Sequence, residues 1–289
     1  MVRFFVLSRF IVRFYKSSIV FLYFLVASHN FTMYFQKGFF MINSNTFSNF
    51  NSKYPIYADL HTHSISSGHG SEDTITDMIR CASESELSLF GISDHGPATS
   101  SSAKPSYFQS LKLADRDRFG IRVLYGVELN IINTAGDVDL DDDTLSTLDY
   151  AIISIHPPIF KPYHDKDLSS AYIRAMDHPK VRFLGHIDDA RFPVDFEYLL
   201  EIAKEKHVYP EINNGSLMPD AYRINGQENC RRILSICKKL DLPVLLSSDS
   251  HGKKNIGNMQ YIFPLLEELD FPAHLVLNSD LSALSEIIR

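Results

Sequence analysis

The sequence contains little cysteine, and no residue before Asp59 is acidic. The three cysteines, Cys81, Cys230 and Cys237, form no Cys-x-x-Cys pair and leave one thiol unpaired in any disulfide scheme. This pattern argues against a disulfide-stapled fold and is typical of a reducing compartment. Cys230 and Cys237 also repeat with Ile233 at helical spacing, as core residues do. We therefore predict free thiols and a cytoplasmic protein.

Several catalytic motifs are absent as well. The chain has no Gly-x-x-x-x-Gly-Lys-Ser/Thr loop, no Gly-x-Gly-x-x-Gly fingerprint and no Gly-x-Ser-x-Gly elbow. These motifs place phosphates, dinucleotides or a nucleophilic serine on a turn. Interpretations as an ATPase, a dinucleotide-dependent enzyme or a serine hydrolase therefore have no local support.

Residues 1–53 differ in kind from the rest of the chain. They hold 12 of the 21 Phe and six of the 28 Lys and Arg residues. Basic residues precede nine apolar ones at 19–27, the outline of a signal peptide, whereas a bilayer span needs about 20 apolar residues. Three interpretations stay open: an extension that is dispensable or precedes the true start, a targeting segment that would export the protein, and a membrane-associated segment. In each case we predict the catalytic domain over 54–289.

The predicted domain is acidic. Positions 54–289 carry 22 basic and 35 acidic residues, a formal charge of −13. Binding to a phosphate backbone needs clustered positive charge, so we expect no nucleic-acid partner. A small anionic substrate held by metal ions is compatible with this charge, and we expect no membrane contact of the domain. No pattern indicates the oligomeric state.

Seven short apolar runs each end at a polar residue able to bind a metal or a substrate. The runs are 56–60, 89–93, 123–127, 151–155, 181–185, 208–212 and 244–248. Helical patterns lie between and after them at 74–87, 196–206, 228–240, 259–269 and 281–288, the first with a capping box of Thr74 and Asp77. Buried parallel strands have this appearance, and α/β barrels collect their chemistry at the strand ends. We predict one α/β barrel with a metal site at the carboxyl ends of its strands.

The strongest candidates for metal ligands are histidines and carboxylates at these ends. His61 and His63 alternate at period two, so both imidazoles project the same way, and Asp249 and His251 repeat the pattern. Glu128 has two oxygens and can bridge two cations. Imidazole and carboxylate without a nearby thiol favour Zn²⁺, Mn²⁺ or Fe²⁺ over Ca²⁺.

Two further acidic segments have less specific interpretations. Asp59 either orients an imidazole or serves as a hydrogen-bonding residue at the strand end. The run 137–143 begins like an EF-hand loop but has Asp142 where that loop needs Gly and Leu148 where it needs Glu. We predict a solvated loop there.

At these residues the chain resembles the PHP (polymerase and histidinol phosphatase) superfamily, most closely its YcdX-like phosphatases. The likeness covers about 54–289. It rests on the motifs Asp-Leu-His-Thr-His at 59–63, Ile-Ser-Asp-His-Gly at 92–96, Gly-Val-Glu-Leu-Asn at 126–130, Glu-Ile-Asn-Asn at 211–214, Asn-Cys-Arg at 229–231 and Ser-Asp-Ser-His at 248–251. The resemblance implies a distorted (β/α)7 TIM-like barrel with three metal ions, zinc being expected and Mn or Fe the alternatives.

The resemblance also implies which residues hold the metals. His61, His63, Glu128 and Asp249 would bind the first ion, Glu128, His156 and His186 the second, and His69, His95 and His251 the third. Glu128, Asp249 and His251 would act in catalysis. The loop after His186 lacks the family's frequent His-Pro-Gly, so its substrate contacts are open. Asn213 is a candidate substrate or supporting contact, and Arg232 a candidate anion binder.

The function implied is a metal-dependent phosphatase that hydrolyses a phosphomonoester with a metal-activated water. One alternative is a phosphodiesterase or nuclease-like activity, because related barrels accompany DNA polymerases. Another is a metal-binding regulatory module without turnover.

Overall fold

The computed structural model describes residues 14–15, 18–19, 51, 53–157, 159–160 and 166–289. The predicted N-terminal extension therefore lies mostly outside the described residues. Of the unit Met1–Asn43, the structure describes β1 (Phe14–Tyr15) and β2 (Ser18–Ile19), which pair antiparallel. All further description concerns the second unit, Ser44–Arg289.

Strands and helices alternate through this unit, as predicted. The strands are β3 (Ala58–Asp59), β4 (Thr62–His63), β5 (Leu89–Ile92), β6 (Asp117–Arg118), β7 (Ile121–Tyr125), β8 (Val127–Asn130), β9 (Ala151–Ser154), β10 (Val181–Leu184), β11 (Tyr209–Asn213), β12 (Leu245–Ser247) and β13 (Ser250–His251). Each of the seven apolar runs contains or overlaps a strand. The prediction of an α/β fold with parallel pairing is confirmed.

The described strands form two larger sheets and a small one. One sheet has the order β12-β11-β10-β9-β8, with parallel pairing throughout, and the other has the order β3-β5-β7-β6, with only β6 antiparallel. Strands β4 and β13 pair in parallel. The described residues form no single closed sheet, so the predicted barrel is not confirmed. The breaks fall at Gly126 and at the residues between β3 and β4 and between β12 and β13, where the chain turns ligand side chains inward.

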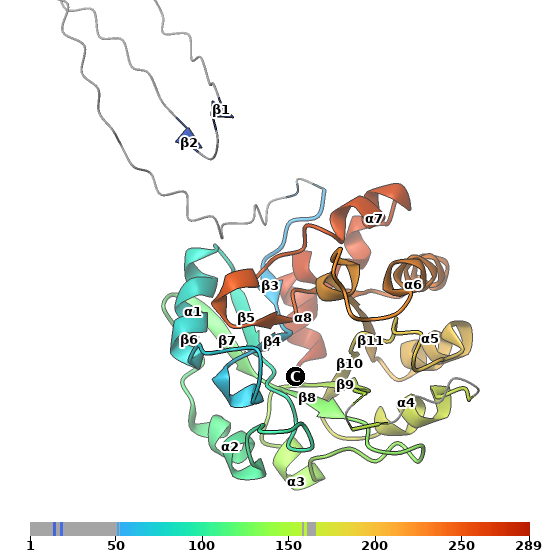
Figure 1. Cartoon of the computed structure of the whole chain (residues 1–289), viewed down its shortest axis with the longest axis horizontal. Helices are drawn as coiled ribbons and strands as arrows, with labels where there is room; N and C mark the ends of the chain where they lie inside the picture. The colour runs from blue at the N-terminus through green and yellow to red at the C-terminus, as the bar shows by residue number, and fades with distance from the viewer. Residues whose placement is uncertain (1–13, 16–17, 20–50, 52, 158, 161–165) are drawn as a thin grey trace, which may run out of the picture. The chain divides into compact units, whose positions relative to one another are not determined.

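Helices surround the strands, with α8 near the centre of the view in Figure 1. They are α1 (Ile75–Glu84), α2 (Pro105–Ser110), α3 (Asp142–Leu145), α4 (Ser169–Ala175), α5 (Phe196–Glu205), α6 (Gly226–Leu240), α7 (Phe263–Glu268) and α8 (Leu281–Ile287). The Thr74–Asp77 capping box of α1 is confirmed. The predicted start of α7 at Met259 is wrong, because Pro264 favours the first turn of a helix over its interior. In the described part of the chain no helix is long and apolar enough to cross a bilayer.

Two apolar clusters lie on opposite faces of the strands. The larger one packs the sheets against the outer helices, and the smaller one includes Leu60, Leu124, Tyr150 and Phe183 together with Leu284 of α8. Tyr150 fills space that Gly91 and Gly126 leave open, because a Cβ at Gly91 would collide with its hydroxyl and one at Gly126 with its ring. Its hydroxyl donates a 2.5 Å hydrogen bond to the Leu60 carbonyl oxygen. The smaller cluster thus fills the space below the strand ends that carry the polar residues.

Asn278 connects the edges of the two larger sheets. Its side chain accepts from the Leu246 amide at 2.7 Å and donates to the carbonyl oxygens of Ala58 and Leu246 at 2.8 and 2.7 Å. Asn278 is fully buried. One side chain therefore satisfies backbone groups of β3 and β12 that no ladder partner reaches.

We expect Asn278→Ala to lower the free energy of unfolding by roughly 3 kcal/mol, since it leaves buried backbone groups of both sheets without partners. Urea unfolding followed by circular dichroism measures the change. Gln260→Ala, at an exposed position, is the control and should stay within about 0.5 kcal/mol of the parent. A change below that limit for Asn278→Ala would show that the two edges do not depend on this bridge.

Candidate metal centre

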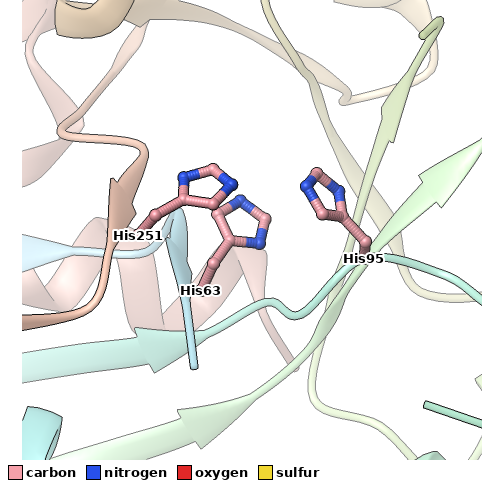
Figure 2. A group of neighbouring side chains, drawn as sticks. All are labelled: His63, His95 and His251. Atoms are coloured by element: carbon pink, nitrogen blue, oxygen red, sulfur yellow. The ribbon is translucent and has the colours of Figure 1, made fainter. Parts of the chain in front are cut away.

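The predicted ligands come together where the strands end. His61 and His63 follow β3, His95 follows β5, and Glu128 lies in β8. His156, His186 and Asp249 follow β9, β10 and β12 in the same way. The register of β4 with β13 places His63 opposite His251, and their rings stack at a centroid distance of 4.3 Å. Figure 2 shows this pair with His95, whose ring lies 4.2 Å from that of His63.

Three groups of side chains have potential ligand atoms within 4.8 Å of one another. They are His61/His63/Asp249, His95/Glu128/His156 and His63/His95/His251. The first group contains three of the four residues predicted for the first metal, all but Glu128. The other two share members with the predicted sets but group them differently, because His95 lies between Glu128 and His63.

The two remaining candidates lie at the margin of these groups. His186 Nε2 is 2.8 Å from Glu128 Oε1, on the side where His156 also approaches. His69 is exposed, and its ring stacks on that of His95 at 4.8 Å and lies tilted by 41° to that of His251 at 5.1 Å. All nine predicted ligands therefore occupy one region of the molecule.

Glu128 lies between the groups and directs its two oxygens to different histidines. Oε1 is 3.3 Å from His156 Nε2 and 2.8 Å from His186 Nε2. Oε2 is 3.4 and 3.5 Å from the Nε2 atoms of His61 and His63, and 2.6 Å from His95 Nδ1. This is the geometry of a carboxylate that can bridge two cations.

Several polar atoms at the centre are buried and, although some lie at ion-pair distance from one another, make no hydrogen bond. They are His61 Nε2, His63 Nε2, both ring nitrogens of His95, His251 Nε2 and Glu128 Oε2. Leaving one such group unpaired costs about 1–3 kcal/mol, so a cluster of them calls for an explanation. All six are imidazole nitrogens or carboxylate oxygens, which bind zinc and similar divalent metals. The residues present therefore fit a metal centre.

Hydrogen bonds to Nδ1, on the side of the ring away from the centre, leave Nε2 of two histidines free to bind a metal. Asn130 Oδ1 lies 2.7 Å from His156 Nδ1, and the Asp249 carbonyl oxygen lies 3.1 Å from His251 Nδ1. Both partners are acceptors, so each Nδ1 carries the proton and donates. The lone pair of each ring is then on Nε2, the atom that faces the centre.

His63 is held by a serine and an aspartate. Ser67 Oγ is 3.0 Å from His63 Nδ1 and donates to Asp94 Oδ1 at 2.7 Å, so it accepts from the ring. The same Oγ accepts from the His95 amide at 3.1 Å. Asp94 also accepts from Tyr107 Oη at 2.5 Å. One serine thus positions two successive ligand-bearing segments.

Part of the acidic run 137–143 supports the centre, so the prediction of a merely solvated loop is incomplete. Asp139 accepts from Asn130 Nδ2 at 2.7 Å and from the Ala98 amide at 2.9 Å. Because Asn130 accepts from His156, Asp139 fixes the orientation of that amide. Asp141 instead caps α3 by accepting from the Thr144 amide. The residues of the run 137–143 do not by themselves indicate which other loops they hydrogen-bond to.

The two oxygens of Asp249 have separate surroundings. Oδ1 faces the centre, 3.2 Å from His63 Nε2 and 3.6 Å from His61 Nε2. Oδ2 accepts from Arg223 Nη2 at 2.8 Å and from Asn213 Nδ2 at 3.0 Å. In the structure Asn213 is therefore a supporting contact of a candidate ligand.

The structure shows the surroundings of two residues that the sequence offered as supporting residues. Arg232 is exposed and lies over the Phe196 ring at 5.1 Å, and the arginine that donates to a candidate ligand is the buried Arg223. Asp59 accepts hydrogen bonds from Ser248 Oγ and from the amides of Ser248 and Gly257. It serves as the strand-end hydrogen-bonding residue that was the other interpretation.

The electrostatics of the centre favour ionised carboxylates. Burial opposes ionisation of Glu128 and Asp249, but neighbouring histidines, and Arg223 beside Asp249, hold the pKa of both carboxyls well below the usual range. Burial lowers the pKa of His63, and the histidines His95 and His251 lower it further. His63 is thus held in the neutral form that a metal ligand requires.

His61 behaves differently from His63. Burial opposes its protonation, but the negative charges of Glu211, Glu128 and Asp249 outweigh burial and raise the pKa of His61 well above its ordinary value. The three carboxylates around this imidazole produce an excess of negative charge. A divalent cation would neutralise that charge, as a proton on the imidazole does.

Two candidate ligand residues have left-handed backbone conformations, with φ of 27° at His186 and 51° at Asp249. Non-glycine residues adopt this region at an energetic cost, and such residues cluster at functional sites. Each lies two residues after the end of a parallel strand, His186 after β10 and Asp249 after β12. The turn aims each side chain at the centre instead of along the strand.

Comparisons with known proteins agree with this geometry. A model of the PHP domain family matches residues 59–215. A Clostridium acetobutylicum protein named a probable phosphatase is 36% identical over 231 residues, 80% of this chain and 93% of its own length. A Clostridium novyi protein with the same description is 35% identical over 222 residues, 77% of this chain and 90% of its own.

A solved structure shares the fold. It is the histidinol phosphate phosphatase of Lactococcus lactis in complex with zinc, L-histidinol and phosphate. The match has a TM-score of 0.52 at 19% identity, and covers 74% of this chain and 94% of that one. With the family model matching more than half of the sequence, the chain belongs to the PHP domain family.

Proposed function

We propose that this protein is a metal-dependent phosphatase that hydrolyses a phosphomonoester at a centre of three metal ions. The observation that carries the proposal is the set of buried, unpartnered imidazole nitrogens and carboxylate oxygens that converge at the strand ends. The relatives named as probable phosphatases, at 35–36% identity over nearly their whole length, support the reaction class.

The metals are assigned to three sets of residues. His61, His63, Glu128 and Asp249 would hold the first ion, Glu128, His156 and His186 the second, and His69, His95 and His251 the third. Bound ions would supply Lewis acidity to the phosphoryl group and lower the pKa of water. Zinc suits the ligands, with manganese or iron as alternatives. The zinc of the Lactococcus structure belongs to that protein, whose 19% identity supports the fold alone.

The chain's own residues define how a substrate approaches. His251, His156 and Asp249 have side-chain exposures of 26, 12 and 10%, whereas His61, His63 and Glu128 have none. A phosphomonoester therefore enters over His251, His156 and the exposed His69. We assign the catalytic contacts to Glu128, Asp249 and His251. Arg223 keeps the charge of Asp249 balanced while Oδ1 stays directed at the centre.

We also propose that the strands form the distorted (β/α)7 barrel of the family. Only Gly126 separates β7 from β8, two residues separate β3 from β4 and β12 from β13, and β13 pairs with β4. These short breaks support one interrupted barrel over 54–289. A cytoplasmic location is consistent with Cys81, Cys230 and Cys237, which are all free thiols.

Metal removal provides the first test. We expect the purified full chain to contain about three equivalents of metal by elemental mass spectrometry and to hydrolyse p-nitrophenyl phosphate. Treatment with a chelator should abolish turnover, and added Zn²⁺ or Mn²⁺ should restore it. Bis-p-nitrophenyl phosphate and single-stranded DNA serve as diester controls. Faster turnover of a diester, or full metal content without any turnover, would contradict the proposal.

Glu128→Gln tests the bridging carboxylate. The amide keeps the size of the side chain but presents one donor group and no charge to the histidines, so we expect turnover to fall by at least about 100-fold. Metal content should fall with it. Asp137→Asn, at an exposed carboxylate of the following loop, is the matched control. A variant that keeps full metal and full activity would remove Glu128 from the centre.

A further inference from the structure

Glu211 is a fully buried carboxylate of β11 that is not among the nine predicted ligands. Its neighbours account for both of its oxygens. Oε1 accepts from Ser247 Oγ and lies 2.5 Å from His61 Nδ1, and Oε2 accepts from the His186 amide at 2.7 Å and from Asn213 Nδ2 at 3.2 Å. Four donors surround the group, so no lone pair is left for a metal.

These contacts connect ligands of two different proposed ions. His61 belongs to the first set and His186 to the second, whereas no side chain of the third set touches Glu211. The strand order explains the connection, because β11 lies between β10, which leads to His186, and β12, which leads to Asp249. Glu211 pairs with Leu245 in the parallel ladder of β11 and β12. This register fixes the position of Glu211 along the strand direction, near the carboxyl ends of the strands.

The contact with His61 determines which ring nitrogen is free. A carboxylate only accepts, so His61 Nδ1 must donate, and the lone pair is then on Nε2, which faces Glu128 and Asp249. The contact with His186 acts on the backbone. The amide of this residue is held by Oε2 while its φ is 27°, a conformation that needs support from its surroundings.

We propose that Glu211 is a positioning residue that sets the first and second metal positions together and leaves the third independent. The inference rests on the proposed three-metal centre. Glu211→Gln is the informative change, because one of the two oxygens becomes an NH₂ group that faces two donors. The oxygen that becomes the NH₂ group no longer accepts from its two donors, and the loss of the negative charge weakens the hydrogen bonds to the remaining oxygen. The contacts to His61 and to the His186 amide are therefore both weakened, without the loss of a ligand.

The test is metal binding to the full chain in the absence of any substrate. Apo protein is titrated with Zn²⁺ against a chromophoric chelator, and Co²⁺ absorption reports each position. We expect Glu211→Gln to bind one equivalent as tightly as the parent and the other two about 10- to 100-fold more weakly. Glu205→Gln, an exposed carboxylate on α5, is the matched control and should leave all equivalents unchanged.

Unchanged affinity of every equivalent in Glu211→Gln, or an equal loss at all three, would overturn the proposal. If that variant does not unfold cooperatively, Ser247→Ala decides, because it removes one donor from Oε1 and keeps the carboxylate. It should weaken the same two equivalents by a smaller factor, and an unchanged or uniform result would again overturn the inference. Failure of the proposed function is separate, since it shows in the parent protein as absent turnover or fewer than three equivalents.

Discussion

The structure depends on one constraint: six polar atoms of four histidines and Glu128 are buried at the same strand ends and have no hydrogen-bond partner. Unpaired polar groups in the interior are destabilising, so the rest of the fold has to hold them in place until a cation satisfies them. The other ring nitrogen of His61, His63 and His251 is paired, with Glu211, Ser67 and the Asp249 carbonyl oxygen respectively. These outer partners leave the lone pairs of the three Nε2 atoms directed at the centre.

Single side chains also direct one polar atom at the centre and give another to an outer hydrogen-bond partner. Asp249 turns Oδ1 inward and gives Oδ2 to Arg223 and Asn213, while His156 turns Nε2 inward and gives Nδ1 to Asn130. Orientation by the outer partner fixes the tautomer of an imidazole and the usable oxygen of a carboxylate. The acidic charge of the domain is compatible with a phosphorylated substrate for the same reason, since the cations would provide the positive charge.

The fold places these polar atoms together because its parallel strands end at a common edge, where short breaks interrupt the strands. Gly126 interrupts one strand beside Tyr150, and the turn at Asp249 interrupts another. Below the breaks, Leu60, Tyr150 and Phe183 close the space with apolar side chains. The breaks cost ladder hydrogen bonds but allow neighbouring segments to project several ligands toward one point.

Local patterns in the sequence determined the strands, most helices and the family, because apolar runs, the Thr74 capping box and ordered motifs such as 59–63 act over a few residues. They also located the candidate ligands, since period-two spacing of His61 with His63 survives in any extended strand. The tertiary structure alone decided the partners: Glu211 beneath His61, Asp139 behind Asn130, and Arg223 in place of the predicted Arg232. These contacts join residues from separate loops and strands, and no spacing along the chain encodes which buried donor meets which acceptor.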